Sequence, residues 1–124
     1  MKNKTIRDSF DNAWEGIKYA FKTQRNIRIH LSVTIIVLIT SWLLAISIRD
    51  FGLIFVAVSL VLFAEMVNTA VEKTVDLFMS TYHPMAKIAK NVSAGAVLVA
   101  VINAIVIGVI ILGMPLIDLV KEIL

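Results

Sequence analysis

Four polar residues recur on one side of a predicted helix, directly after an uncharged run at residues 51–64: Glu65, Asn68, Glu72 and Asp76. At about 100° per helical residue, spacings of three and four positions place all of them in one narrow stripe. Three carboxylates in one stripe repel each other unless a cation or a bound proton relieves them. Beside a membrane, such a stripe favours a functional site over the alternative, a solvated helix face.

The residue types in and near this stripe suit phosphoryl transfer. Carboxylates and an asparagine are hard oxygen ligands of the kind that Mg²⁺ takes together with substrate phosphates. Lys87 and Lys90 follow in the sequence, and a lysine can bind phosphate as a point charge, although for Lys87 a solvated or headgroup-contacting role is favoured. For His83, a place at a helix start is favoured over metal ligation. The sequence has no P-loop and no glycine-rich kinase loop, which excludes those two site types.

The elements that position this stripe are predicted to be membrane helices. The chain has 124 residues, is 59% hydrophobic and lacks cysteine. We therefore expect one domain over 1–124, with no disulfide or cysteine metal site. The predicted fold class is all-α integral membrane, with an amphipathic surface helix within 1–29 and membrane helices at 30–48, 51–79 and 92–113.

The breaks between these helices are also predicted from local sequence. Arg49-Asp50 is expected to form a tight charged turn, and the run at 80–84 to end the second membrane helix, with Pro84 starting the next segment. We expect residues 85–90 to be turn-rich. Gly113-Met114-Pro115 is expected to break the last helix.

The basic residues give the expected orientation. Of twelve Lys and Arg residues, seven precede His30 and three lie from Lys73 to Lys90. Basic residues that flank apolar spans mark the cytoplasmic side of a membrane rather than a nucleic-acid surface. We expect the N-terminus and the stripe to be cytoplasmic and the C-terminus to be outside. Because three helices make a thin bundle, a homo-oligomer is expected.

Several motifs carry a resemblance to a known family. The runs Glu65-Met66-Val67-Asn68-Thr69-Ala70-Val71-Glu72, His83-Pro84-Met85-Ala86-Lys87 and Ala94-Gly95-Ala96-Val97 resemble the prokaryotic diacylglycerol kinase family. Together with the run from Arg25 to His30, they are most similar to its Gram-positive branch, the undecaprenol kinases. The resemblance covers roughly residues 12–112 and implies a homotrimer in a bacterial plasma membrane. It also implies that Mg²⁺ and ATP are used to phosphorylate a lipid alcohol, undecaprenol in preference to diacylglycerol.

The same resemblance implies roles for individual residues. Glu65 matches the general base for the lipid hydroxyl, and Glu72 matches a metal ligand. The remaining matches are supporting polar residues (Asn68, Asp76), the nucleotide site (Tyr82, His83, Lys90, Asn91) and the surface helix (Trp14, Gly16).

Two positions depart from the family pattern. Gln24 stands where the family usually has the other glutamate metal ligand, and Asn91 stands where it usually has aspartate. Each change removes a negative charge while keeping the shape of the side chain, so metal affinity and alignment should suffer. A catalytically weakened membrane subunit of the same fold is therefore one alternative. A small proton-coupled transporter built around Glu65 is another, although its carboxylates would be expected near the middle of the bilayer.

Overall fold

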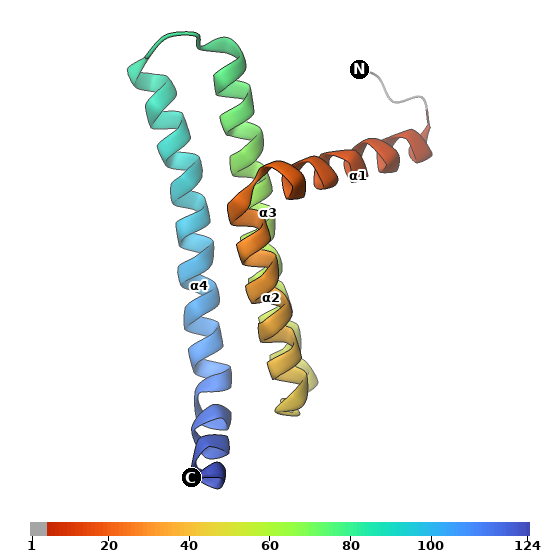
Figure 1. The fold of residues 1–124 in the computed structure, drawn as a ribbon, viewed down its shortest axis with the longest axis vertical. Helices are drawn as coiled ribbons and strands as arrows, with labels where there is room; N and C mark the ends of the chain where they lie inside the picture. The colour runs from red at the N-terminus through yellow and green to blue at the C-terminus, as the bar shows by residue number, and fades with distance from the viewer. Residues whose placement is uncertain (1–4) are drawn as a thin grey trace.

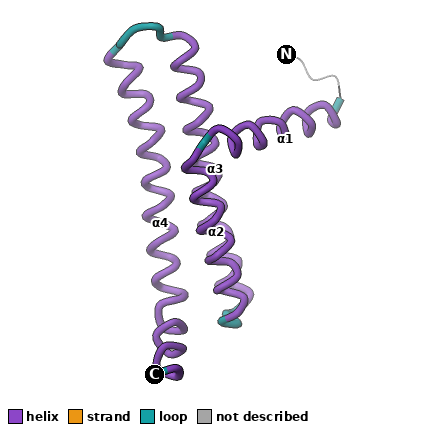
Figure 2. Tube along the Cα trace, viewed as in Figure 1, coloured by secondary structure: helices purple, strands orange, loops and turns teal. Residues whose placement is uncertain are grey.

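The computed structural model describes residues 5–124, whose regular elements are all helices. They are α1 (Ile6–Thr23), α2 (Arg25–Leu43), α3 (Ile48–Phe78) and α4 (Pro84–Ile123). Figure 1 shows α2, α3 and α4 running along one another, with α1 leaving at a steep angle, and Figure 2 marks the loops between the helices in the same view. α4 packs mainly against α3, and α2 also packs against α3. The expected all-α class is confirmed.

Three of the four helices are long and apolar enough to cross a membrane. They are α2 with 19 residues, α3 with 31 and α4 with 40. At 1.5 Å per residue, even the shortest is about as long as a bilayer core is thick. Because α3 is longer than α2, it continues past the level at which α1 meets α2 and ends at the loop to α4 (Figure 1).

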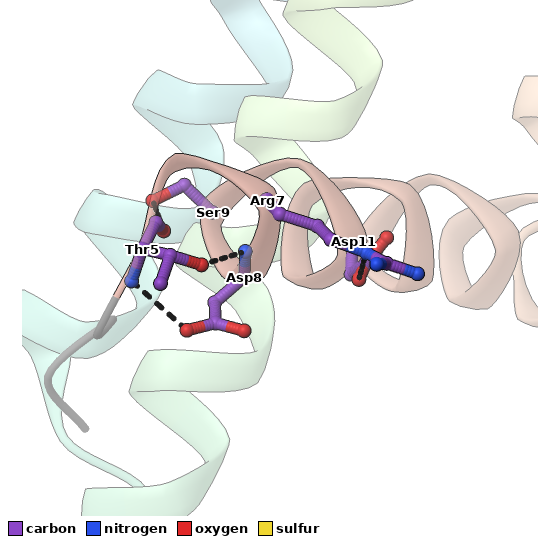
Figure 3. Close-up of polar contacts among 5 residues, drawn as sticks. All are labelled: Thr5, Arg7, Asp8, Ser9 and Asp11. Carbon is purple, nitrogen blue, oxygen red and sulfur yellow. Dashed lines mark hydrogen bonds and ion pairs between the residues drawn. The ribbon is translucent and has the colours of Figure 1, made fainter.

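Helix α1 begins with a reciprocal cap. The backbone N–H of Asp8 donates to Thr5 Oγ1 at 3.1 Å, and the backbone N–H of Thr5 donates to Asp8 Oδ2 at 2.9 Å (Figure 3). This capping box satisfies two N–H groups at the helix start. One turn on, Arg7 and Asp11 form an exposed ion pair at 3.9 Å (Figure 3). Ile6, Phe10 and Trp14 are exposed, whereas Ala20 is buried near the junction with α2.

The corner between α1 and α2 is a single residue, Gln24, in an extended conformation. Arg28 reaches back across this corner, and its Nη1 donates to the carbonyls of Phe21 and Lys22 at 2.9 and 3.0 Å. Those carbonyls lie in the last turn of α1, where intrahelical donors are missing. Arg28 therefore ties the end of α1 to α2 and fixes the direction in which α1 leaves.

The connection from α2 to α3 lies earlier in the chain than expected. Helix α2 ends at Leu43, and Ala45 adopts a positive φ of 50°. Ser47 then caps α3, its Oγ accepting from the Asp50 N–H at 3.1 Å. The expectation of a turn at Arg49-Asp50 was wrong, because an aspartate at the third helical position suits the positive end of the helix dipole.

The start of α4 agrees with only part of the expectation. Helix α3 ends at Phe78 and Pro84 is the first residue of α4, so the break at 80–84 is confirmed. Residues 85–90, expected to be turn-rich, are instead the first turns of α4. The expected break at 113–115 was also wrong, since α4 continues through Pro115 to Ile123. Pro115 removes one backbone donor, and apolar membrane helices tolerate that loss.

The packed core lies at the end of the bundle away from the α3–α4 loop. Ile54 and Val58 of α3 and Leu112 of α4 are buried against each other. The half-buried residues around this cluster come from α2, α4 and the α2–α3 connection: Val37, Leu38, Leu44, Ile46, Ile107 and Ile111. The cluster joins all three long helices and holds α2 and α4 against α3.

Several hydroxyl groups of α2 and α3 donate back to their own helix. Ser32, Ser41, Thr69 and Thr74 each donate to the carbonyl four residues earlier, at distances from 2.7 to 2.9 Å. These hydrogen bonds satisfy the hydroxyls without a partner on another helix.

Candidate active site

The polar stripe on α3 passes from a buried to an exposed setting. Glu65 is 4% exposed, Asn68 and Glu72 are half-buried, and Asp76 is exposed. The level at which α1 and α2 meet lies at the buried end of the stripe, because His30, early in α2, contacts Glu65. The stripe thus runs from the packed helices towards the α3–α4 loop.

Glu65 is held by a residue on another helix. His30 Nε2 lies 3.2 Å from Glu65 Oε1, and the Glu65 side chain is 5% exposed. The Glu65 carbonyl accepts a hydrogen bond from Thr69 Oγ1 at 2.9 Å. A buried carboxylate is costly unless it is paired or hydrogen-bonded, and the His30 imidazole supplies that partner.

Asn68 connects Glu72 to helix α4. Asn68 Nδ2 donates to Glu72 Oε1 at 3.4 Å, and Ser93 Oγ donates to Asn68 Oδ1 at 2.7 Å. Ser93 Oγ also lies 2.9 Å from the Lys90 carbonyl, so its single proton is shared between two acceptors. This chain of contacts restricts the orientation of the Glu72 carboxylate.

Asp76 and Lys90 form a second link between α3 and α4. The Lys90 ammonium donates to Asp76 Oδ1 in an ion pair whose two side chains are 39% and 57% exposed. Surface pairs of this kind contribute little to stability. Their effect here is positional, because the pair keeps a lysine cation at the level of Asp76, about one turn beyond Glu72 on α3.

Gln24 is not joined to Glu72 by a hydrogen bond in residues 5–124. Its Nε2 instead donates to Thr23 Oγ1 at 3.3 Å, and the residue occupies the α1–α2 corner. One chain therefore does not bring the two expected metal ligands into direct contact.

The expected surface-helix residues lie on α1, where Gly16 faces α3 and Trp14 does not contribute to the cavity between the two helices. Trp14 is 59% exposed. Gly16 lines a cavity of about 300 Å³ between α1 and α3, opposite Thr69 and Lys73. Since α4 contacts Asn68 and Asp76 and α1 faces Thr69 and Lys73, these two helices flank the stripe.

The other residues expected near a nucleotide lie at the start of α4. Tyr82 is 76% exposed in the α3–α4 loop. His83 caps α4, its Nδ1 accepting from the Met85 N–H at 3.2 Å, so a helix-start role is present. Asn91 is exposed and follows Lys90. The structure thus places Lys90 against the stripe, and Tyr82, His83 and Asn91 outside its hydrogen-bond network.

The oxygen ligands of the stripe suit a metal ion that is bound together with phosphate groups. Among residues 5–124, no three His, Asp or Glu side chains lie close enough together to hold an ion by themselves. Mg²⁺ in nucleotide sites needs only one or two carboxylates, because phosphate oxygens and waters complete its coordination. Glu72, half-buried and oriented by Asn68, fits that requirement.

An apolar groove leads towards the buried end of the stripe. It has a volume of about 400 Å³ and lies between α2, α3 and α4. His30 lines it on α2, Val61 on α3, one turn before Glu65, and Gly108 on α4. The groove therefore joins the membrane-facing part of the bundle to the His30–Glu65 pair.

Two residues of this network were not predicted as part of the site. His30 entered only as part of a similar run before the first span, and Ser93 was not singled out. One feature of the sequence could have indicated His30. It is a titratable side chain that directly precedes the uncharged run beginning at residue 31. Nothing in the local sequence distinguishes Ser93 from a serine that bonds to its own helix.

Comparison with known proteins identifies the family. The family model described as "Prokaryotic diacylglycerol kinase" matches residues 11–112. A diacylglycerol kinase of Synechocystis is 43% identical over 112 residues, which is 90% of this chain and 64% of that protein. The chain thus spans just under two thirds of the Synechocystis protein's length.

For two further relatives, the match to this chain extends over a larger share of the relative's length. An undecaprenol kinase of Bacillus subtilis is 39% identical over 103 residues, 83% of this chain and 84% of that protein. A diacylglycerol kinase of Escherichia coli K12 is 34% identical over 95 residues, 76% of this chain and 77% of that protein. The model match includes the whole stripe together with His30, Lys90 and Ser93. The chain belongs to the prokaryotic diacylglycerol kinase family of lipid kinases.

Proposed function

We propose that this protein transfers the γ-phosphate of ATP to the hydroxyl of a membrane lipid alcohol at the cytoplasmic surface of a bacterial plasma membrane. The observation that carries the proposal is Glu65, a carboxylate buried on a membrane-length helix and held by His30 at 3.2 Å. It adjoins the Asn68–Glu72 contact on one side and the apolar groove on the other. A base in this setting can meet a hydroxyl whose tail stays in lipid.

The proposed chemistry begins at the second oxygen of Glu65. Glu65 Oε2 takes the proton of the lipid hydroxyl as the hydroxyl oxygen attacks the γ-phosphorus. The bond from the γ-phosphorus to the bridging oxygen breaks, and ADP leaves with that oxygen. Positioning and charge stabilisation supply most of the rate in such transfers.

The remaining residues of the stripe hold the nucleotide in this proposal. Glu72, with Gln24 in the position of a family acid, would hold the Mg²⁺ that enters with ATP, and the ion when bound neutralises charge on the β- and γ-phosphates. Asn68 orients Glu72, and Asp76 holds Lys90 where its ammonium can pair with a phosphate oxygen. Tyr82, His83 and Asn91 form the rim near the nucleotide, and Trp14 and Gly16 lie on α1 at the lipid surface.

Undecaprenol is the acceptor that we propose first, and diacylglycerol is the second. The motifs His83-Pro84-Met85-Ala86-Lys87 and Ala94-Gly95-Ala96-Val97 support undecaprenol, as does the 39% identity to the Bacillus subtilis undecaprenol kinase. The higher identity to the Synechocystis diacylglycerol kinase supports diacylglycerol.

The proposal includes the assembly and its orientation. Large apolar side chains remain exposed along all three long helices of one chain, which supports burial in lipid and against further copies in a homotrimer. The exposed Ile6, Phe10 and Trp14 support a position of α1 at the membrane surface. Basic residues before His30 and around Lys90 support a cytoplasmic site, with the C-terminus outside.

A catalytically weakened subunit is the second candidate function. Gln24 and Asn91 favour it, because both replace acids of the family pattern with neutral amides. The transporter alternative has less support, since the acids of the stripe, Glu65, Glu72 and Asp76, lie towards one end of the bundle rather than near its middle.

One assay separates these candidates. Purified protein in detergent is incubated with γ-labelled ATP, Mg²⁺ and either undecaprenol or diacylglycerol, and label in the lipid fraction is counted. We expect transfer to at least one lipid and its loss in Glu65→Gln. Absence of transfer to both lipids would remove the kinase proposal and leave the weakened subunit.

A further inference from the structure

We propose that His30 is a positioning residue for Glu65, holding one carboxylate oxygen so that the other faces the acceptor hydroxyl. The inference rests on the proposed function, because it assigns the residue that prepares the base. It starts from a cross-helix ion-pair contact of a buried carboxylate, the 3.2 Å approach of His30 Nε2 to Glu65 Oε1.

The contact engages only one of the two carboxylate oxygens. In the described part of the chain, Glu65 Oε2 has no hydrogen-bond partner, yet no buried side-chain oxygen is left unpaired. Oε2 therefore keeps some access to its surroundings. A carboxylate with one oxygen bound and one accessible presents a single, defined site for a proton.

The geometry of the helices makes His30 suited to this task. His30 comes from α2 and Glu65 from α3, so the 3.2 Å contact restricts the glutamate rotamer from outside its own helix. The His30 side chain is 25% exposed and lines the apolar groove, to which Val61 of α3 also contributes. The imidazole thus lies between the groove and the base, with its Nε2 3.2 Å from Oε1.

The alternative is that His30 only satisfies a buried acid. That role predicts a loss of stability without a specific loss of turnover. A positioning role predicts a fall in kcat, because a misplaced catalytic group loses about 100-fold in rate for a shift of about 1 Å. Glutamine places an N–H close to the position of imidazole Nε2, so it should restore the donor and the rate.

The test compares purified wild-type protein, His30→Ala, His30→Gln and Ser32→Ala in the labelled-ATP assay with undecaprenol and diacylglycerol. Ser32 lies on the same helix and bonds only to its own backbone, which makes it the matched control. We expect kcat to fall about 100-fold in His30→Ala, with KM for MgATP unchanged, and to recover most of the way in His30→Gln. Thermal unfolding of each variant identifies any that do not fold.

A second measurement needs neither ATP nor lipid. The infrared carboxylate bands of Glu65 are assigned by difference from Glu65→Gln, and they should shift in His30→Ala and return in His30→Gln. Wild-type activity with unchanged kcat in folded His30→Ala, or a change in lipid KM alone, overturns the positioning role while the proposed function stands. A folded His30→Gln that is as slow as His30→Ala also overturns it. An inactive wild type overturns both proposals.

Discussion

At the residue scale, the stripe on α3 divides into parts with different surroundings. Glu65 is buried against His30, Glu72 is half-buried against Asn68, and Asp76 is exposed with Lys90. The spacing of these residues predicted a common face, since helical periodicity depends only on sequence position. It could not predict their burial, because α2 and α4 decide that.

The two amides should limit the rate of this chain. Gln24→Glu combined with Asn91→Asp is expected to raise kinase turnover at a fixed, limiting Mg²⁺ concentration, because the reversions return two negative charges near the proposed metal and nucleotide. Labelled-ATP transfer at several Mg²⁺ concentrations measures the effect.

The matched control is Gln24→Asn with Asn91→Gln, which changes side-chain length without adding charge. Turnover that is equal in wild type and in the double acid variant would show that the amides are not limiting.

Ser93 should affect catalysis through Asn68 rather than through stability. Ser93→Ala removes the 2.7 Å contact that fixes Asn68 against Glu72. A hydrogen bond contributes about 0.5–1.5 kcal/mol, so we expect kcat to fall about 2- to 10-fold. Steady-state assays with saturating lipid measure it, with Ser59→Ala on α3 as the control. A kcat equal to wild type would contradict the role of Ser93.

At the scale of the elements, a helix boundary could be predicted where a single residue type restricts the backbone conformation. Pro84 has no N–H and a fixed φ, so the start of α4 was readable from sequence. The α2–α3 connection contains no glycine, proline or asparagine, and Ala45 takes the positive φ there. The continuation of α4 past Pro115 depends on its apolar surroundings, which a local motif does not report.

The groove between the three long helices should accommodate the lipid tail. Gly108 lines it, and a Cβ at this position would meet no atom within 4 Å, so Gly108→Leu is expected to fill groove volume without a backbone clash. We expect a several-fold higher KM for the lipid alcohol and little change in KM for MgATP. Gly52→Leu, on α3 outside the groove lining and equally free of near atoms, is the control.

Assays at varied lipid fraction in mixed micelles measure both KM values. Equal lipid KM values for Gly108→Leu and Gly52→Leu would exclude the groove as the tail site.

At the scale of the whole molecule, the predicted orientation can be tested directly because the chain contains no cysteine. Thr81→Cys lies in the α3–α4 loop, and Ile48→Cys, 83% exposed in the native chain, lies at the start of α3. We expect a membrane-impermeant maleimide to label position 48 in intact cells and position 81 only after permeabilisation. The reverse pattern would place the site outside.

The hydroxyl groups that donate to their own helices bear on how the chain enters the membrane. Ser32, Ser41, Thr69 and Thr74 are satisfied before any neighbouring helix is present. Between the long helices of residues 5–124, the cross-helix polar contacts are His30–Glu65, Ser93–Asn68 and Lys90–Asp76, all towards one end. Each helix can therefore insert as an independent unit, and these three pairs form when the inserted helices associate. The site is therefore completed only when the inserted helices associate.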